Sequence, residues 1–203
     1  MNHILNQTIK TVFDRSDSTF RTLNYNKYEK CGDETIQLIN NMNPQLVLDL
    51  GCGDNLYKKH IKNLIGIDII NTKADIISDI SSLSYEDNSV DACLCYGSIN
   101  FGDDKLIEIQ LNEMNRVLKS DGISIFRGNT NASDMIQYYI WNEERIQYWT
   151  NYFNFTLQVE PIIINRLKKD GTGVNNKWRD GTSQKAGVAP RSIKRLYWIW
   201  RKK

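Results

Sequence analysis

The chain has 203 residues, of which 40% are hydrophobic and 25% are charged. This composition is typical of a globular protein, and the length suits one α/β domain with a buried core. No apolar run approaches the roughly 20 residues that a membrane-spanning helix needs, and residues 1–7 lack the basic start and apolar core of a secretory signal. We therefore expect a cytoplasmic protein without a membrane segment.

The net charge of +2 is distributed unevenly along the chain. Residues 162–203 contain twelve Lys and Arg residues against two Asp residues, a net charge of +10, which leaves −8 for the rest of the chain. This asymmetry indicates either a surface that binds an anionic partner or a solvated tail that aids solubility.

The four cysteines do not follow the pattern of a small disulfide-bonded secreted protein. Cys93 and Cys95 would share one face of a strand, an arrangement that also suits two metal ligands. No second Cys or His pair lies at zinc-like spacing, so we interpret them as buried thiols and predict no metal site.

Hydrophobic periodicity predicts strands and helices in alternation along the chain. Residues 1–32 form a polar lead-in, and a helix follows that ends at Pro44. Strands are predicted over residues 45–50, 64–70, 74–77, 90–96, 123–126, 155–167 and 196–200. Further helices are predicted over residues 55–63, from 103 to 120, and over 133–152, the last with Ser133 as N-cap and Asp134 in its first turn.

This alternation predicts a single Rossmann-like, doubly wound α/β domain over residues 1–203, with a mainly parallel sheet covered on both faces. Two successive C-terminal strands without a helix between them predict an antiparallel pair at one edge. Residues 33–130 form the predicted ligand-binding core, and residues 168–192 a basic loop between the last two strands. Ligands of such sheets bind beyond the carboxyl ends of the strands.

Residues 47–55, with the sequence VLDLGCGDN, join the first strand to the helix predicted after it. Gly51 and Gly53 let the backbone turn tightly and let a ligand approach the main chain closely. The N-terminus of the following helix offers unpaired N–H groups. Asp68 ends the next strand, where its carboxylate can accept hydrogen bonds from the two hydroxyls of a ribose.

These features resemble the class I S-adenosylmethionine-dependent methyltransferases, in particular the small type 11-like group. Five blocks carry the resemblance in order: LDLGCGD at 48–54, GIDI at 66–69, DI at 79–80, DNSVD at 87–91 and NRVLK at 115–119. The resemblance implies a methyltransferase that uses S-adenosylmethionine and releases S-adenosylhomocysteine.

The resemblance also assigns the methionine and sulfonium end of the cofactor to particular residues. Gly51 and Gly53 would pass under the methionine and ribose, and Asp49 would support the loop or the cofactor amino group. Tyr96 and Gly97, at the end of the fourth strand, would lie beside the sulfonium. A turn-capping role for Asp49 stays open.

For the adenosine end, the resemblance places Asp68 on the ribose and Ile69 against the adenine. Asp79 would accept from the exocyclic amine and the Ile80 N–H would donate to the ring. A simple helix-capping role for Asp79 is the alternative.

NAD is the rival cofactor for a glycine-rich turn of this kind. A dinucleotide fingerprint requires a third glycine three residues after Gly53, and this chain has Leu56 there. Asn55 stands where many methyltransferases have a third glycine. The pattern therefore favours S-adenosylmethionine.

Methyl transfer from a sulfonium depends on positioning and exclusion of water, and a base is needed only when the acceptor must lose a proton. Tyr96, Asn100 and Arg127 are the candidate catalytic residues, because they follow the fourth and fifth strands, and Asn129 lies near them. Each of Arg127 and Asn129 can equally be an ordinary loop residue. Residues 96–101 lack the Asp/Asn-Pro-Pro-Tyr/Phe and Pro-Cys motifs of amino-directed and cytosine-directed methyltransferases.

The basic loop bears on the acceptor. Its Lys and Arg side chains would lie above the pocket and attract phosphate or carboxylate groups; they are Lys168, Lys169, Lys177, Arg179 and Lys185. Trp178 could stack on a base or ring. Three functions stay open, namely methylation of an anionic small molecule such as a sugar, lipid precursor or nucleotide, methylation of RNA or DNA on the basic C-terminal region, and a non-catalytic adenosyl-binding or structural role.

Overall fold

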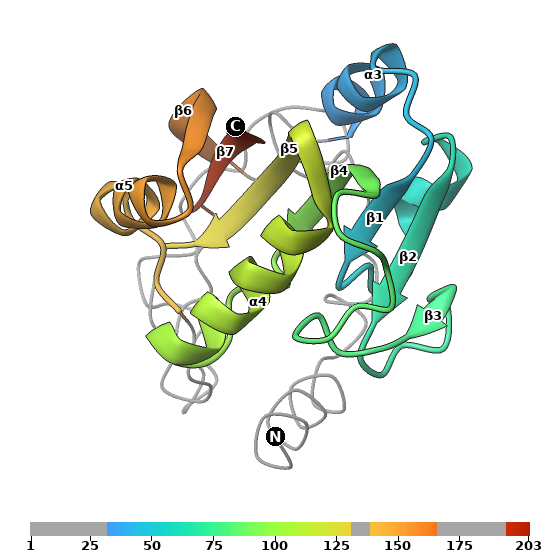
Figure 1. Ribbon diagram of the computed structural model, residues 1–203, viewed down its shortest axis with the longest axis horizontal. Coiled ribbons are helices and arrows are strands. Elements are labelled where there is room, and N and C mark those ends of the chain that lie inside the picture. Colours follow the sequence, from blue (N-terminus) through green and yellow to red (C-terminus); the bar gives the residue numbers. More distant parts are fainter. Residues whose placement is uncertain (1–31, 131–138, 166–193) are drawn as a thin grey trace, which may run out of the picture.

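The computed structural model describes residues 32–130, 139–165 and 194–203 (Figure 1). The predicted lead-in before residue 32, the predicted helix start at Ser133 and Asp134, and the basic loop with Trp178 lie outside the described residues. The strands are β1 (Val47–Leu50), β2 (Leu64–Asp68), β3 (Ile76–Ile77), β4 (Val90–Tyr96), β5 (Leu118–Asn129), β6 (Phe155–Asn165) and β7 (Lys194–Lys202). The helices are α3 (Asp33–Asn41), the 3-10 helix η2 (Leu56–Lys59), α4 (Asp104–Val117) and α5 (Glu143–Tyr152).

The seven strands form one sheet in the order β3-β2-β1-β4-β5-β7-β6. Strands β1 to β5 pair in parallel, whereas β7 runs antiparallel to both β5 and β6. This confirms the predicted Rossmann-like, mainly parallel sheet with an antiparallel C-terminal pair. Because β6 is parallel to β5, β6 ends and β7 begins where β1, β2, β4 and β5 end, an edge called the carboxyl edge below.

Residues of the longer strands belong to two hydrophobic clusters, one on each face of the sheet. Leu48 and Leu50 of β1 join the cluster that includes Leu111 of α4, which Figure 1 shows lying along the sheet. Val47 of β1 joins the other cluster with Ile39 of α3. Asp49 therefore belongs to the face of the sheet that α3 covers.

The predicted helix over residues 55–63 is wrong, because only the four-residue η2 forms there. Asn55 has a left-handed backbone conformation, and its side-chain Nδ2 donates to the Lys73 carbonyl and to Asp75 Oδ2, both at 3.2 Å. A Cβ on Gly66 would lie 2.4 Å from Asn55 Oδ1, so the amide packs directly on β2. The hydrogen bonds and packing of the Asn55 side chain thus hold the segment between β1 and β2 in a mostly non-helical conformation.

The single helix predicted over residues 133–152 is also wrong, because residues 139–142 are not helical and α5 begins at Glu143. Its N-cap is Asn142, whose side chain accepts from the Arg145 N–H. Trp141 explains the break, since its backbone N–H donates to the Asn129 carbonyl and its indole N–H to the Ile99 carbonyl. Tertiary hydrogen bonds outweigh helix propensity here.

Two of the five sequence blocks lie at the amino ends of β4 and β5, far from the carboxyl edge. Arg116 donates to Glu113, to Asp87 and to the carbonyls of Leu83 and Tyr85. Nearby, the Lys119 ammonium donates to Asp91, which also accepts from the backbone N–H groups of residues 45 and 46. These blocks stabilise the scaffold.

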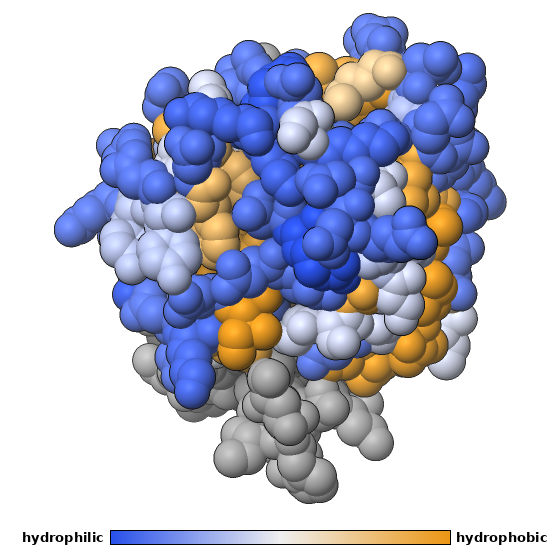
Figure 2. All heavy atoms as spheres, viewed as in Figure 1, coloured by the Kyte–Doolittle hydropathy of each residue, from blue (hydrophilic) through white to orange (hydrophobic). Residues whose placement is uncertain are grey.

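The two edges of the sheet differ in length. β3 has two residues, and Ile77 is 54% exposed there; Figure 2 shows apolar surface on the side of the molecule where β3 lies. At the other end of the sheet, Trp198 and Trp200 are fully buried because β7 is an inner strand. None of the helices in the described ranges is long and apolar enough to cross a membrane.

Candidate functional site

The glycine loop after β1 has two glycines with different surroundings. Gly51 has φ +73°, and a Cβ there would lie 2.3 Å from the Cβ of Ser98, so the loop packs tightly on the segment after β4. Gly53 has φ +53°, and no described atom lies within 4 Å of the position of its Cβ. Gly51 is therefore needed for packing, whereas the space beside Gly53 is open among the described residues.

Asp68 is buried at the end of β2 and braces the loop. Its Oδ2 accepts from the Gly53 N–H at 3.0 Å, and its Oδ1 accepts from the N–H groups of Ile70 at 3.0 Å and Asn71 at 2.9 Å. A carboxylate offers about four lone-pair directions, so three are used and one is left for a ribose hydroxyl.

Asp49 lies beside this brace on β1 and is only 3% exposed. Burial, and then the charge of Asp68, raises the pKa of Asp49 to about 7, while the charge of Arg127 opposes the rise. Near neutral pH the Asp49 side chain is therefore only partly ionised, and a cationic ligand group would favour its charged form.

Tyr96 and Arg127 pair with each other across β4 and β5 at the carboxyl edge. The Arg127 guanidinium lies 5.0 Å from the centre of the Tyr96 ring, and its Nη2 is 3.5 Å from the Tyr96 carbonyl oxygen. The Tyr96 hydroxyl hydrogen-bonds Thr35 Oγ1 of α3 at 2.5 Å, and its ring meets that of Tyr57 edge-on. The start of α3 is thereby fixed beside the site.

Asn100 is 1% exposed in the segment after β4. Its Oδ1 accepts from the Asn129 N–H at 3.2 Å, which orients the amide, and Nδ2 has no hydrogen-bond partner in the part of the chain that the structure describes. A Cβ on Gly97, whose φ is +86°, would lie 3.6 Å from Nδ2. A buried donor is therefore aimed toward Gly97, at the predicted position of the sulfonium.

On the adenosine side, Ile69 follows Asp68 directly and is half-buried. Asp79 Oδ1 accepts from the Ser81 N–H at 2.8 Å within a turn; no helix begins there, so the alternative helix-capping role is wrong. Ile80 is buried in the same cluster as Leu83. The contacts of these residues with adenine stay predictions.

Sequence reasoning missed three residues that shape the site. Thr35 hydrogen-bonds the Tyr96 hydroxyl, and Ser98 contacts Gly51. Trp141 packs on Gly128 and donates its backbone N–H to the Asn129 carbonyl. Thr35 and Tyr96 are 61 positions apart, and no local pattern indicates such a contact.

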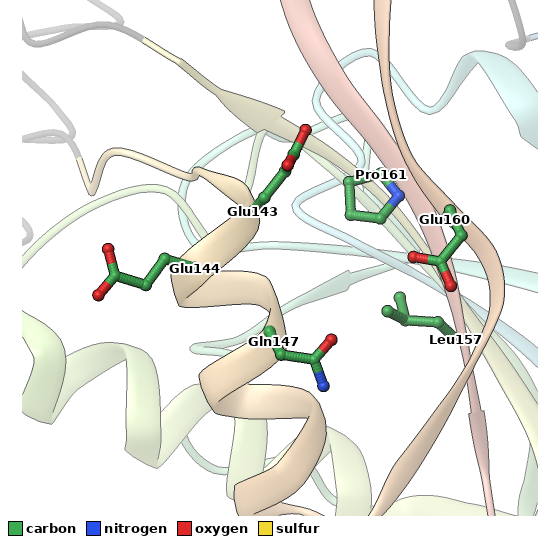
Figure 3. Close-up of a pocket in the computed structure, with 6 residues that line it drawn as sticks. All are labelled: Glu143, Glu144, Gln147, Leu157, Glu160 and Pro161. Carbon is green, nitrogen blue, oxygen red and sulfur yellow. The ribbon is translucent and has the colours of Figure 1, made fainter.

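A separate hollow of about 460 Å³ lies between α5 and β6, away from all the predicted site residues (Figure 3). Glu143 and Glu144 of α5 and Glu160 of β6 line it together with Gln147, Leu157 and Pro161. Its acidic lining would repel an anion, and no group of three or more potential metal ligands occurs among the described residues.

Comparison with known proteins agrees with this geometry. Residues 48–126 match the family model of the methyltransferase domain, type 11. An uncharacterized protein of Methanocaldococcus jannaschii is 29% identical over 129 residues, which cover 58% of this chain and 50% of the relative. The match therefore spans about half the length of that relative.

Solved structures share the fold at low sequence identity. The 1,6-didemethyltoxoflavin-N1-methyltransferase of Burkholderia thailandensis, with bound 1,6-didemethyltoxoflavin and S-adenosylhomocysteine, has a TM-score of 0.67 at 13% identity and covers 100% of this chain and 91% of its own. An S-adenosylmethionine-dependent methyltransferase of Archaeoglobus fulgidus has a TM-score of 0.53 at 13% identity, with coverages of 84% and 94%. The [4+2]-cyclase SpnF has a TM-score of 0.54 at 15% identity and covers 84% of this chain and 80% of its own.

The fold is that of the class I methyltransferases, and residues 48–126 match the methyltransferase domain of the type 11 group. S-adenosylmethionine is the cofactor of this class. The predicted family, fold and cofactor are thus confirmed. The open space at Gly53 and the remaining lone pair of Asp68 fit an adenosyl group, whose individual contacts stay predictions.

Proposed function

We propose that this chain transfers a methyl group from S-adenosylmethionine to a small acceptor that carries an anionic group. The observation that carries the proposal is the placement of Arg195. It is half-buried at the start of β7 and pairs with Asn129 on β5 and Ile164 on β6. A cation therefore lies on the carboxyl edge next to β5, the strand that carries Arg127.

The charge of the sequence supports the same proposal. The segment between β6 and β7 starts and ends at the carboxyl edge, because Asn165 and Lys194 pair there. That segment belongs to the stretch with a net charge of +10. Positive potential around a site raises the local concentration of anionic ligands and speeds their association. The Burkholderia neighbour, which holds a small acceptor with S-adenosylhomocysteine, indicates that the fold can accommodate both.

Methyl transfer requires mainly that the protein position the cofactor and the acceptor relative to each other. When bound, S-adenosylmethionine supplies an electrophilic methyl carbon on a sulfonium. Where the anionic group is itself the atom that is methylated, no proton has to be removed and a general base is dispensable. Asn100 Nδ2 is oriented to donate a hydrogen bond near Gly97, and the Tyr96 ring, held by Thr35, forms one wall. These residues would orient the acceptor and exclude water.

The test is methyl transfer to a panel of small carboxylates and phosphate esters, each compared with its neutral amide or dephosphorylated form. Arg195→Gln should raise KM for the preferred acid about tenfold with kcat nearly unchanged, because one charge-assisted hydrogen bond is lost. Arg201→Gln is the matched control, since Arg201 lies on the same strand and donates to Gln158 and the Asp121 carbonyl at the opposite end. Equal use of neutral and anionic acceptors would contradict the proposal.

A nucleic-acid acceptor is the second candidate, and the basic C-terminal stretch is the feature that favours it. Phosphate contacts make affinity fall steeply with salt. Binding of single-stranded RNA or DNA that weakens by orders of magnitude between low and physiological salt would support this candidate. Methylation of small acids without such binding would support the first.

A further inference from the structure

A hydrogen-bond donor without a partner lies just beyond the end of β4. Asn100 is 1% exposed, and its side-chain Nδ2 has no hydrogen-bond partner in the part of the chain that the structure describes. Such atoms are rare in folded proteins, because a buried donor that has lost water and gained no acceptor destabilises the fold. A ligand that accepts a hydrogen bond from Nδ2 would restore what folding removed.

The backbone around Asn100 fixes the direction in which its amide points. Oδ1 accepts from the Asn129 N–H at 3.2 Å, and a backbone N–H can only donate, so Nδ2 is the atom left without a partner. The Asn100 carbonyl accepts from the Tyr139 N–H at 2.8 Å, and the Asn129 carbonyl accepts from the Trp141 N–H at 2.7 Å. These hydrogen bonds hold both segments, so the amide is oriented as a donor before a ligand binds.

A glycine leaves space in front of this donor. Gly97 is the first residue after β4 and has φ +86°. A Cβ at this position would lie 3.6 Å from Asn100 Nδ2, which is the one described atom within 4 Å of it. The surroundings of Gly51 differ, because a Cβ there would overlap Ser98. Gly97 and the Asn100 amide therefore border the same space at the end of β4.

The order of the strands indicates which reactant lies against this donor. β4 lies between β1, which carries the glycine loop, and β5, which is followed by β7 (Figure 1). A cofactor on the β1 side and an anionic acceptor beside Arg195 of β7 must meet at the end of β4, because methyl transfer requires the reacting atoms to be in contact. Ser98 contacts the glycine loop, whereas the Asn100 amide is held by Asn129 of β5. Asn129 in turn pairs with Arg195, so Nδ2 belongs to the acceptor's side.

We propose that Asn100 determines the specificity for the acceptor, because its Nδ2 donates a hydrogen bond to a carbonyl oxygen next to the atom that is methylated. The inference rests on the proposed function, since it concerns the acceptor of that reaction, and it narrows the substrate class to small acids with such a carbonyl. A carbonyl oxygen only accepts hydrogen bonds. An amino group in its place would set one donor against another and leave both unpaired, which disfavours binding.

Calorimetric titration of two matched acids into the complex with S-adenosylhomocysteine tests the proposal. One acid is nicotinate with a carbonyl oxygen on the carbon next to the ring nitrogen and opposite the carboxylate, and the other has an amino group on that carbon. Both carry the anion, and binding to the product complex does not depend on the reactivity of either ring nitrogen. The wild type should bind the carbonyl acid about tenfold more tightly than the amino acid analogue, because one hydrogen bond is gained and one unpaired donor avoided.

Asn100→Ala should reduce this preference to about twofold or less while leaving the affinity for S-adenosylhomocysteine within about twofold of the wild type. A purely structural role of Asn100 would instead weaken both acids equally and leave their ratio unchanged. Asn40→Ala is the matched control. Asn40 Oδ1 also accepts from a backbone N–H, that of Lys62, but its Nδ2 already donates to the His60 carbonyl. Asn40 belongs to α3, and its substitution should leave the ratio at the wild-type value.

The outcomes distinguish this inference from the proposed function. Equal affinity of the wild type for the two acids, or a preference that persists in Asn100→Ala, would overturn the inference while leaving the anionic acceptor in place. Absence of binding of both acids to the wild-type complex would overturn the proposed function as well, because both carry the anion. A preference for the carbonyl acid that is lost in Asn100→Ala supports both, and the wild-type ratio decides alone if that variant does not fold.

Discussion

Replacing Asp49 with Asn should make the ligand-free protein more stable, and the gain should grow with pH. The pKa of Asp49 is about 7 in the folded protein against an ordinary value of 3.8. The folded state thus binds more protons than the unfolded state between these values. The stability that protonated Asp49 contributes is therefore complete below about pH 4 and is lost as the pH rises to 7.

A rise of this size corresponds to about 4 kcal/mol of stability, lost in full above pH 7. Only part of it is lost by pH 5, so the stability difference between Asp49→Asn and wild type should increase by about 3 kcal/mol from pH 5 to pH 8. Urea denaturation of both proteins at the two pH values, without ligand, measures this difference. A difference that does not change with pH would refute the reasoning, because the amide removes the titrating group and little else.

Three other outcomes are expected. Arg116→Met should lower the free energy of unfolding by about 2 kcal/mol, because it removes hydrogen bonds to two carboxylates and two carbonyls; urea denaturation checks the loss, and calorimetry should find the affinity for S-adenosylhomocysteine unchanged. Gly51→Ala should cost about 2 kcal/mol or more, since its Cβ would overlap Ser98, and thermal unfolding at wild-type Tm would contradict this. S-adenosylhomocysteine should bind about tenfold more weakly at pH 6 than at pH 8, because its ammonium requires ionised Asp49; calorimetry at both pH values tests this, and the same dependence in Asp49→Asn would contradict it.

The sequence predicted the strands of the sheet well, because their apolar runs are bounded by turn residues. β4 was predicted residue for residue, and the antiparallel C-terminal pair followed from two strands without an intervening helix. The segment 55–63 was misread as a helix. Its apolar spacing is helical, but left-handed Asn55 and Asn63 bound it and the Asn55 amide packs on Gly66.

Some residues of the candidate site could likewise be predicted from the sequence, whereas others could not. Asp49, Asp68 and the glycines were identifiable because they lie together in short motifs next to strand ends. The role of Arg127 depends on a tyrosine 31 positions away, and the role of Thr35 on one 61 positions away. Such contacts depend on the pairing of strands, which a single sequence does not encode locally.

We infer that the open space over Gly53 is the cofactor site, and Gly53→Asn tests this inference directly. Asn adopts the left-handed conformation readily, as Asn55 does with φ 54° two residues later, and no described atom obstructs a Cβ at position 53. The variant should therefore fold with nearly the wild-type Tm while its side chain fills the space.

Calorimetric titration of S-adenosylhomocysteine into wild type and Gly53→Asn is the measurement. We expect binding to the wild type and a loss of at least about tenfold in the variant, since its side chain would displace the ligand from close contact with the backbone. Failure of the folded wild-type protein to bind, or equally tight binding by both proteins, would contradict it.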